Sequence, residues 1–196
     1  MNKIDHPTLF SQIPAQSLVN TPLAEKLRPK SIDEIVGQEK SIGKKSVFYS
    51  LLQKGSLPSL ILWGPPGTGK TTFARLLADT VSAHFLNINA VESGTAAIRK
   101  VGNEAHQLRL EQNKSTILFV DEIHRFNKGQ QDVLLPFVES GDFILIGATT
   151  ENPSYELNKA LMSRCHLLRF ERLTPFDMHQ LIIKACKHFQ VEVSDW

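Results

Sequence analysis

Short apolar runs alternate along the chain with segments whose apolar residues recur at helical spacing. The runs are Leu60–Trp63, Phe85–Ile88, Thr116–Val120, Phe143–Ile146 and Leu167–Phe170. Runs that are apolar throughout suit strands buried on both faces, and strands that alternate with helices are typical of a parallel sheet. Ligands bind such sheets at the carboxyl ends of the strands, so functional side chains are expected just after each run.

Helical patterns fill the intervals between these runs. The first begins at Gln38, carries Ile42, Val47, Leu51 and Leu52 on one side, and stops near Gly55. Two more are expected at Thr72–Asp79 and around Leu157–Met162. Together the patterns predict an α/β fold in which helices cover both faces of a five-stranded parallel sheet.

The pattern changes after Phe170. Thr174 has the character of an N-cap, Pro175 suits the first helical position, and Asp177 completes a capping box for a helix that runs towards Phe189. A single helix cannot bury its own apolar face, so residues 173–196 are expected to begin a second, truncated helical domain. Residues 1–22 are polar and interrupted by prolines, which predicts a mobile arm and leaves residues 23–172 as the core domain.

Composition narrows the class of protein. Of 196 residues, 41% are hydrophobic and 21% are charged, an ordinary balance for a soluble domain with one buried core. The net charge of +2 does not indicate a nucleic-acid binder, although it is compatible with a local basic face. Cys165 and Cys186 are too few for a disulfide framework and are expected to be free thiols. With no long apolar run and no signal-peptide core, a cytoplasmic protein with no membrane contact is expected.

A phosphate-binding motif follows the first strand directly. The segment Gly64-Pro65-Pro66-Gly67-Thr68-Gly69-Lys70-Thr71 fits the pattern G-x-x-x-x-G-K-[ST], and Thr72 opens the next helix. Backbone N–H groups of such a loop close around a β-phosphate, and the helix N-terminus adds positive potential. Lys70 is expected to reach the β and γ oxygens of ATP, and the Thr71 hydroxyl to bind Mg²⁺. An ordinary glycine-rich turn is the alternative, which the strand–loop–helix placement disfavours.

Two carboxylates end the strand at residues 116–120. Adjacent residues on a strand point in opposite directions, so Asp121 and Glu122 can have different roles. Asp121 is expected to hold Mg²⁺, as the equivalent acid does in P-loop enzymes, and Glu122 to act as general base on the attacking water. A solvated strand end would explain the two acids equally well without the P-loop upstream. His124 follows without a second ligand at zinc spacing, so no metal is assigned to the histidines.

Two further candidates are ambiguous from their sequence context. Thr149 and Thr150 end the strand at residues 143–146, where a hydroxyl can contact the γ-phosphate, although threonine is also simply a good strand residue. Arg164 lies at the end of the helix around Leu157–Met162. It could pair with the C-terminal end of that helix, or stabilise charge during phosphoryl transfer at a neighbouring subunit.

These motifs together resemble those of the RarA (MgsA) family of AAA+ P-loop ATPases, which is related to the eukaryotic Werner-helicase-interacting ATPase. The strings DEIHRFNK at residues 121–128 and GATTENPS at residues 147–154 are more specific than a P-loop alone, and the likeness extends from about Pro22 to about Lys187. The segment from Pro22 to Pro29, with Val36-Gly37-Gln38-Glu39, is similar to the family's N-terminal segment that contacts adenine. The resemblance thus implies adenine contacts by Leu27, Arg28, Pro29, Val36 and Gly37.

The resemblance also implies a DNA-stimulated ATPase that acts as a homo-oligomer at stalled or gapped replication forks, near single-strand-binding protein. By this likeness Thr150, or Thr149, is the first sensor and Arg164 is the trans-acting arginine finger. The rest of the lid with its second sensor arginine and the family's C-terminal oligomerisation region do not occur in this sequence, which predicts a fragment. The N-terminal arm also lacks the Cys/His zinc cluster of the eukaryotic relatives, which favours a bacterial-type protein.

Two alternatives stay open at this stage. One is a clamp-loader or Holliday-junction-helicase-like AAA+ motor, and the other is a non-hydrolysing AAA+ scaffold. Scaffolds usually lose the P-loop lysine or the catalytic glutamate, but this chain keeps Lys70 and Glu122. Leu9-Phe10 in the arm could be a partner-docking peptide, although short apolar pairs are common by chance. DNA-contact candidates, which solvated helix faces explain equally well, are Arg99, Lys100, Arg109, Arg125 and Lys128.

Overall fold

The computed structural model describes residues 23–190 and contains a five-stranded sheet in the order β2-β3-β4-β1-β5. Every pair of neighbouring strands is parallel. The strands are β1 (Leu60–Trp63), β2 (His84–Asn89), β3 (Thr116–Asp121), β4 (Ile144–Thr149) and β5 (His166–Arg169). Each overlaps one predicted apolar run, so the predicted parallel α/β fold is confirmed.

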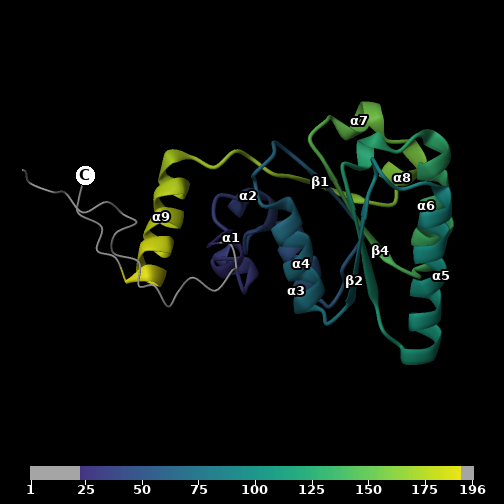
Figure 1. Cartoon of the computed structure of the whole chain (residues 1–196), viewed down its shortest axis with the longest axis horizontal. Coiled ribbons are helices and arrows are strands. Elements are labelled where there is room, and N and C mark those ends of the chain that lie inside the picture. Colours follow the sequence, from purple (N-terminus) through teal and green to yellow (C-terminus); the bar gives the residue numbers. More distant parts are fainter. Residues whose placement is uncertain (1–22, 191–196) are drawn as a thin grey trace, which may run out of the picture.

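Helices cover both faces of the sheet (Figure 1). One face carries α2 (Glu39–Ile42), α3 (Val47–Gln53) and α4 (Lys70–Thr80). The other carries α5 (Thr95–Gln112), the short 3-10 helix η3 (Ile123–Arg125), α6 (Lys128–Ser140) and α8 (Lys159–Met162). The remaining helical elements are α1 (Leu23–Lys26), η2 (Ile32–Glu34), α7 (Pro153–Glu156) and α9 (Pro175–Phe189).

Alternate residues of the central strands enter two separate cores. In β3, Phe119 packs into the core beneath α4, while Leu118 and Val120 pack into the core beneath α5 and α6. All three side chains are fully buried, and burying one large apolar side chain stabilises a fold by about 1.5–3 kcal/mol. The strands are therefore held firmly from both sides, which fixes the positions of the polar residues at their carboxyl ends.

The predicted helix from Gln38 to Gly55 is wrong, because the chain forms two short helices there. A Cβ atom on Gly43 would lie 2.3 Å from the carbonyl oxygen of Glu39, so the chain passes this point only with a glycine. A new helix then starts at Val47, with Ser46 as its N-cap, whose hydroxyl accepts a hydrogen bond from the Tyr49 N–H at 3.1 Å. The second helix buries a different face from the one predicted. Val47, which the pattern places on the apolar side, is 75% exposed, whereas Phe48 is buried.

The helix predicted around Leu157–Met162 begins later, at Lys159. Asn158 stops the helix from starting earlier, because its side chain acts as the N-cap and accepts from the Leu161 N–H at 2.7 Å. Leu157 is instead the C-cap residue of α7.

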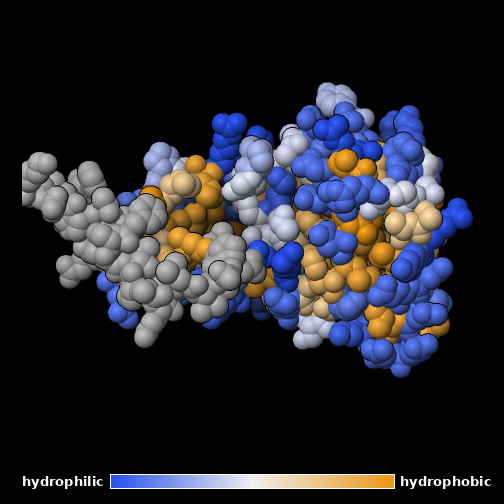
Figure 2. Space-filling model, in the orientation of Figure 1, coloured by the Kyte–Doolittle hydropathy of each residue, from blue (hydrophilic) through white to orange (hydrophobic). Residues whose placement is uncertain are grey.

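Helix α9 lies apart from the sheet, on the side of α1 and α2, and begins as predicted (Figure 1). Thr174 and Asp177 form a capping box, with Pro175 at the first helical position. Figure 2 shows apolar side chains gathered over α9, where Phe176, Met178 and Ile182 are exposed. That α9 opens a second domain stays a prediction. The predicted arm at residues 1–22, with Leu9-Phe10, and the final residues 191–196 lie outside the described residues.

Both cysteines are free thiols, as expected from their number. Burial raises the pKa of the Cys165 thiol to about 12. Over residues 23–190, none of the helices is both long and apolar enough to span a bilayer.

A buried carboxylate joins α5 to the turn between α6 and β4. The side chain of Asp142 is only 8% exposed. Its carboxylate lies 2.8 Å from His106 Nδ1 and 3.1 Å from an Arg109 guanidinium nitrogen. It also accepts a hydrogen bond from the Ser140 hydroxyl. Burial raises the pKa of Asp142, but the hydrogen bonds from Ser140 and His106 and the charge of Arg109 outweigh it, so the pKa lies below its ordinary value.

Asp142→Asn is expected to lower the free energy of unfolding at pH 7 by about 1–2 kcal/mol, because charge-assisted hydrogen bonds are lost. In a domain of this size the Tm should fall by about 2–8 °C. An aspartate with a lowered pKa stabilises the fold above its ordinary value of 3.8 and loses that contribution as pH falls through the folded-state value. The Tm difference should therefore shrink near pH 3. Thermal unfolding at pH 7 and pH 3 measures the Tm difference between the wild type and Asp142→Asn, with exposed Glu104→Gln as control. A Tm difference at pH 3 equal to that at pH 7 would contradict the assigned role of the Asp142 carboxylate.

Candidate nucleotide-binding site

The loop between β1 and α4 is held at its start by two neighbouring strands. The Gly64 N–H donates to the carbonyl oxygen of Thr149 at 3.1 Å, and a Cβ atom on Gly64 would lie 2.1 Å from the carbonyl oxygen of Phe170. Gly67 and Gly69 have φ angles of +74° and +92°, which side chains other than glycine rarely adopt. The glycines of the motif are therefore required by the backbone path of the loop.

Lys70, the first residue of α4, points back over this loop. Its ammonium donates to the carbonyl oxygens of Gly64 at 2.7 Å and of Pro65 at 2.8 Å. Burial lowers the pKa of Lys70, and the charges of Glu122 and Asp121 oppose that shift. The lysine is thus placed between the loop and the two acids at the end of β3.

One cavity of about 370 Å³ brings the predicted phosphate, metal and water residues together. Its volume is in the range of small-molecule sites. The cavity is lined by Pro66, Gly67, Thr68, Gly69, Lys70, Thr71, Thr72, Asp121, Glu122 and Thr150. Residues from three separate segments of the sequence therefore meet at the carboxyl edge of the sheet, where the strand pattern predicts the chemistry.

The two acids have different backbone conformations. Asp121 is the last residue of β3, and its carboxylate accepts a hydrogen bond from the Glu122 N–H at 3.1 Å. Glu122 has left the strand and has a φ of +52°. The predicted reason for their different directions, alternation along a strand, is therefore wrong, because Glu122 is in a left-handed turn. Both acids nevertheless line the same cavity.

The donor set suits a magnesium ion bound together with a nucleotide. Thr71 supplies a hydroxyl and Asp121 a carboxylate, which are ligands that Mg²⁺ accepts, and both line the cavity. Among residues 23–190, no group of three or more His, Cys, Asp and Glu side chains could hold a metal ion. A magnesium ion bound here with a nucleotide would take phosphate oxygens and water as its further ligands.

The two threonines at the end of β4 are in different environments. Thr149 is buried, and its hydroxyl lies 3.0 Å from His124 Nδ1 and accepts from the Glu151 N–H at 3.0 Å. Thr150 lines the cavity with Lys70 and Glu122. Of the two candidates for contact with the γ-phosphate, Thr150 is the one that faces the cavity.

The segment that resembles an adenine contact is divided between two places. Arg28 and Pro29, which follow Leu27, line a separate cavity of about 420 Å³ beside the C-terminal half of α4, together with Leu76. Gly37, next to the half-buried Val36, lies instead near the start of α9, where a Cβ atom would be 2.7 Å from Leu173. The structure does not bring Leu27, Arg28 and Pro29 into the cavity that Lys70 lines.

Gln38 connects this region to the P-loop and has no assigned role in the sequence-based prediction. Its buried side chain donates to the Glu171 carbonyl oxygen and accepts from the Glu171 N–H, both at 2.9 Å, and lies 3.5 Å from the Thr68 carbonyl oxygen. The glutamine thereby links the N-terminal segment, the phosphate loop and the connection to α9. Its position beside Gly37 in the family-like string is the signal that could have identified it.

Arg164 follows α8, which is anchored to α6. The buried Gln131 of α6 accepts from the Asn158 N–H at 2.7 Å and donates to the carbonyl oxygens of Phe126 and Glu156 at 3.0 Å. Arg164 itself lies 2.5 Å from a Glu139 carboxylate oxygen. It also donates at 2.8 Å to the Ala160 carbonyl oxygen, as the helix-end interpretation expects, and it does not line the cavity around Lys70.

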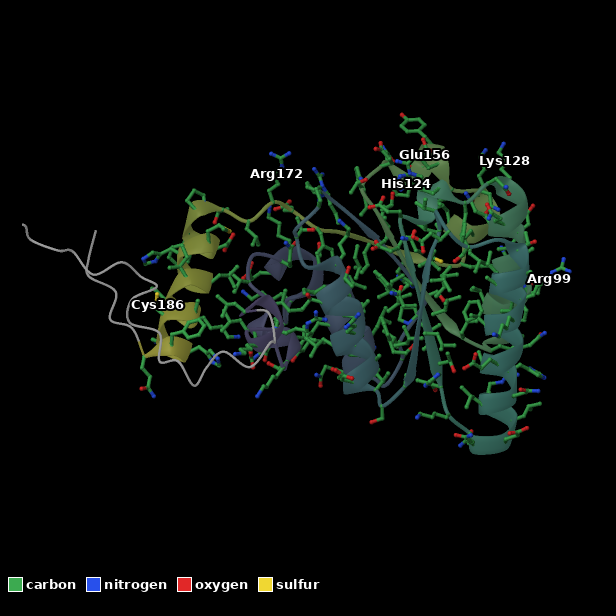
Figure 3. The ribbon with its side chains drawn as sticks, viewed as in Figure 1. Arg99, His124, Lys128, Glu156, Arg172 and Cys186 are labelled. Atoms are coloured by element: carbon green, nitrogen blue, oxygen red, sulfur yellow. The ribbon has the colours of Figure 1, made fainter. Side chains whose placement is uncertain are left out.

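One of the five basic candidates for DNA contact, Arg109, forms an ion pair with Asp142. Arg99 and Lys100 are exposed on the first turns of α5. Arg125, the last residue of η3, and Lys128, the first residue of α6, are also exposed. Figure 3 shows Arg99 and Lys128 pointing away from the sheet. The two helix starts are adjacent, since Gln130 donates to the Ser93 carbonyl oxygen at 2.9 Å.

A family model described as "ATPase family associated with various cellular activities (AAA)" matches residues 60–173, more than half of the chain. The chain belongs to the AAA family. The matched residues contain the P-loop, both acids, Thr150 and Arg164. The predicted AAA+ P-loop fold and membership of an ATP-hydrolysing family are thereby confirmed.

Relatives in this AAA family agree with the more specific resemblance. Replication-associated recombination protein A of Haemophilus influenzae is 49% identical over 164 residues, which cover 84% of this chain and 36% of that protein. ATPase WRNIP1 of Dictyostelium discoideum is 49% identical over 161 residues, which cover 82% of this chain and 18% of that protein. The predicted resemblance to the RarA family is confirmed. The chain spans little more than a third of the bacterial relative.

Solved structures of an AAA+ motor share the fold. The structure of the Holliday junction branch migration motor RuvB from Thermotoga maritima superposes with a TM-score of 0.68 at 30% identity. The superposition covers 86% of this chain and 56% of RuvB.

Proposed function

We propose that this chain is the ATP-binding and ATP-hydrolysing domain of a DNA-dependent AAA+ ATPase that acts at stalled or gapped replication forks. The observation that carries the proposal is the single cavity in which Lys70, Thr71, Asp121, Glu122 and Thr150 meet. These residues supply a phosphate contact, oxygen ligands for Mg²⁺, a carboxylate base and a hydroxyl, which are the parts that phosphoryl transfer to water requires.

In the proposed reaction, the P-loop N–H groups and the Lys70 ammonium bind the phosphates of ATP. Thr71 and Asp121 would hold a Mg²⁺ ion bound with the nucleotide, and that ion would neutralise charge on the phosphate oxygens. Glu122 accepts a proton from water as the water oxygen bonds to the γ-phosphorus and the bond to the β-phosphate oxygen breaks, which leaves ADP and phosphate. Thr150 donates a hydrogen bond to the γ-phosphate or orients the water.

The biological assignment rests on the relatives named for replication-associated recombination, whose identity to this chain approaches one half. By that likeness the full-length protein is a homo-oligomer in the bacterial cytoplasm, associated with the nucleoid. It binds single-stranded, gapped or forked DNA near single-strand-binding protein. Exposed Arg99, Lys100, Arg125 and Lys128 supply positive charge for phosphate contacts.

A branch-migration motor is the second candidate, because the RuvB structure has the same fold. The identity of 30% to RuvB is well below the 49% to the recombination protein over a similar share of this chain, which favours the first assignment. A non-hydrolysing scaffold is disfavoured by Lys70 and Glu122, both of which line the cavity.

DNA is expected to stimulate ATP turnover by the full-length protein, with an affinity that falls steeply as salt rises. Each phosphate neutralised on single-stranded DNA contributes a slope of about −0.7 in log K against log salt concentration. Arg99→Ala should make the slope shallower by about that amount. Phosphate release with single-stranded, duplex and forked DNA, and DNA titrations at several salt concentrations, measure the two effects.

The matched control is Lys114→Ala, which removes an exposed positive charge just beyond the opposite end of α5 and should leave the slope unchanged. A rate that no DNA alters would favour the scaffold assignment. Preferential stimulation by four-way junctions would favour the branch-migration motor.

A further inference from the structure

A histidine follows the proposed base and is buried against it. His124 lies in η3 at the end of the sheet near α7 (Figure 3). Its side chain is 8% exposed, and Nδ1 lies 3.3 Å from a Glu122 carboxylate oxygen and 3.0 Å from the Thr149 hydroxyl. The same ring nitrogen therefore faces both Glu122 and the end of β4.

The hydrogen-bond partners determine where the ring proton lies. A carboxylate only accepts, so an unprotonated Nδ1 would face Glu122 with a lone pair. The Thr149 hydroxyl can donate to the Glu151 carbonyl oxygen at 3.2 Å, so it does not need Nδ1 as an acceptor. With the proton on Nδ1, the ring donates to the Thr149 hydroxyl at 3.0 Å and presents the same N–H to the Glu122 carboxylate at 3.3 Å.

Glu122 needs such a partner because its own backbone does not fix its carboxylate. The residue has left β3 with a φ of +52°, and its side chain is 39% exposed. Within residues 23–190, no other basic side chain forms an ion pair with this carboxylate. A glutamate side chain has several rotamers of similar energy, and a hydrogen bond from a buried ring selects among them.

The ring is in turn held by groups that also hold the phosphate loop. The Thr149 hydroxyl accepts from the Glu151 N–H, and the Thr149 carbonyl oxygen accepts from the Gly64 N–H at 3.1 Å. Thr150, the next residue, lines the cavity with Glu122. Glu122 is thus linked through His124 and Thr149 to the end of β4, and the same strand end is bonded to the start of the P-loop.

We propose that His124 is a positioning residue that holds the Glu122 carboxylate towards the attacking water through a hydrogen bond from Nδ1–H. The inference rests on the proposed role of Glu122 as base. A histidine that only fills space in the core is the alternative, and it predicts that ring volume matters rather than the donor atom.

The test compares His124→Leu with His124→Asn in the full-length protein. The two new side chains have the same branched shape, but the asparagine amide nitrogen can donate from near the position of Nδ1. In His124→Leu, kcat should fall by roughly 10- to 100-fold, the usual range for losing a hydrogen bond to a charged group. Affinity for a fluorescent nucleotide should stay within about twofold, because the P-loop is unchanged. His124→Asn should recover most of kcat.

Equal kcat losses in the two variants, or a loss of nucleotide affinity in place of kcat, would overturn the inference. If His124→Leu does not fold, His124→Phe keeps a ring without the donor, and the same loss of kcat is expected. Wild-type kcat in His124→Phe would equally overturn the inference. Tm values for all variants separate loss of fold from loss of rate.

A double variant separates this inference from the proposed function. In a Glu122→Gln background, single-turnover hydrolysis should be no slower when His124→Leu is added, because no carboxylate base remains to be positioned. A further tenfold loss would show that His124 acts elsewhere. Wild-type turnover in Glu122→Gln alone would remove the proposed base itself, whereas a slow Glu122→Gln beside a fully active His124→Leu would defeat only the role of His124.

Discussion

Lys70→Ala is expected to lose most nucleotide affinity and turnover, whereas Glu122→Gln is expected to bind ATP and hydrolyse it poorly. The Lys70 ammonium is the positive side chain within the phosphate cavity, so its removal weakens every state that contains the nucleotide. Loss of one hydrogen bond to a charged group corresponds to roughly 10- to 100-fold in affinity. Glu122→Gln keeps the P-loop, Thr71 and Asp121 but removes the proton acceptor, which is worth about 10²–10⁴ in rate.

Fluorescent-nucleotide titration measures binding, and phosphate release measures turnover. Lys54→Ala and Glu104→Gln make the same chemical changes at exposed positions outside the cavity and should behave as wild type. Wild-type turnover in Glu122→Gln would exclude that residue as the base. Unchanged affinity in Lys70→Ala would show that the loop backbone alone supplies the phosphate binding.

The strands and the phosphate loop could be predicted from the sequence because each depends on local pattern. A run such as Ile117–Val120 is apolar enough to be buried on both faces wherever it packs, and it does pack so. The P-loop glycines adopt left-handed conformations that belong to the loop itself. Parallel strands share one carboxyl edge. Because Lys70, Asp121 and Thr150 each lie at or just beyond the end of a predicted strand, their proximity could also be predicted.

Other features could not be predicted because they depend on tertiary contacts. Gly43 interrupts a helical pattern that continues in the sequence, and the clash that a Cβ atom there would make with the Glu39 carbonyl oxygen is visible only in the structure. Glu122 adopts a left-handed turn that its residue type does not favour. His124 has no distinctive spacing, and its contacts with Glu122 and Thr149 arise from the packing of η3 against β4.

Arg164→Ala is expected to bind ATP but to be nearly inactive, if Arg164 completes the site of a neighbouring subunit. Within one chain the guanidinium pairs with Glu139 on α6 and does not line the phosphate cavity, so a role in phosphoryl transfer would have to be at the site of a neighbour. In GTPases an arginine finger is worth roughly 10³–10⁵ in kcat, which sets the size of the expected loss. Arg75→Ala, a change of the same kind on α4, is the matched control.

The single variant does not distinguish a role in the same subunit from a role in the next one, but mixing two inactive proteins does. Arg164→Ala subunits keep Glu122, and Glu122→Gln subunits keep Arg164. In a randomly mixed homo-oligomer, about one site in four then joins an intact base to an intact neighbouring arginine, if sites act independently. Phosphate release from the mixture should recover to about that fraction of the wild-type rate. A role in the same subunit predicts no recovery, because every subunit lacks one of the two groups. Absence of recovery, with subunit exchange verified by a labelled pull-down, would therefore return Arg164 to a structural role at the end of α8.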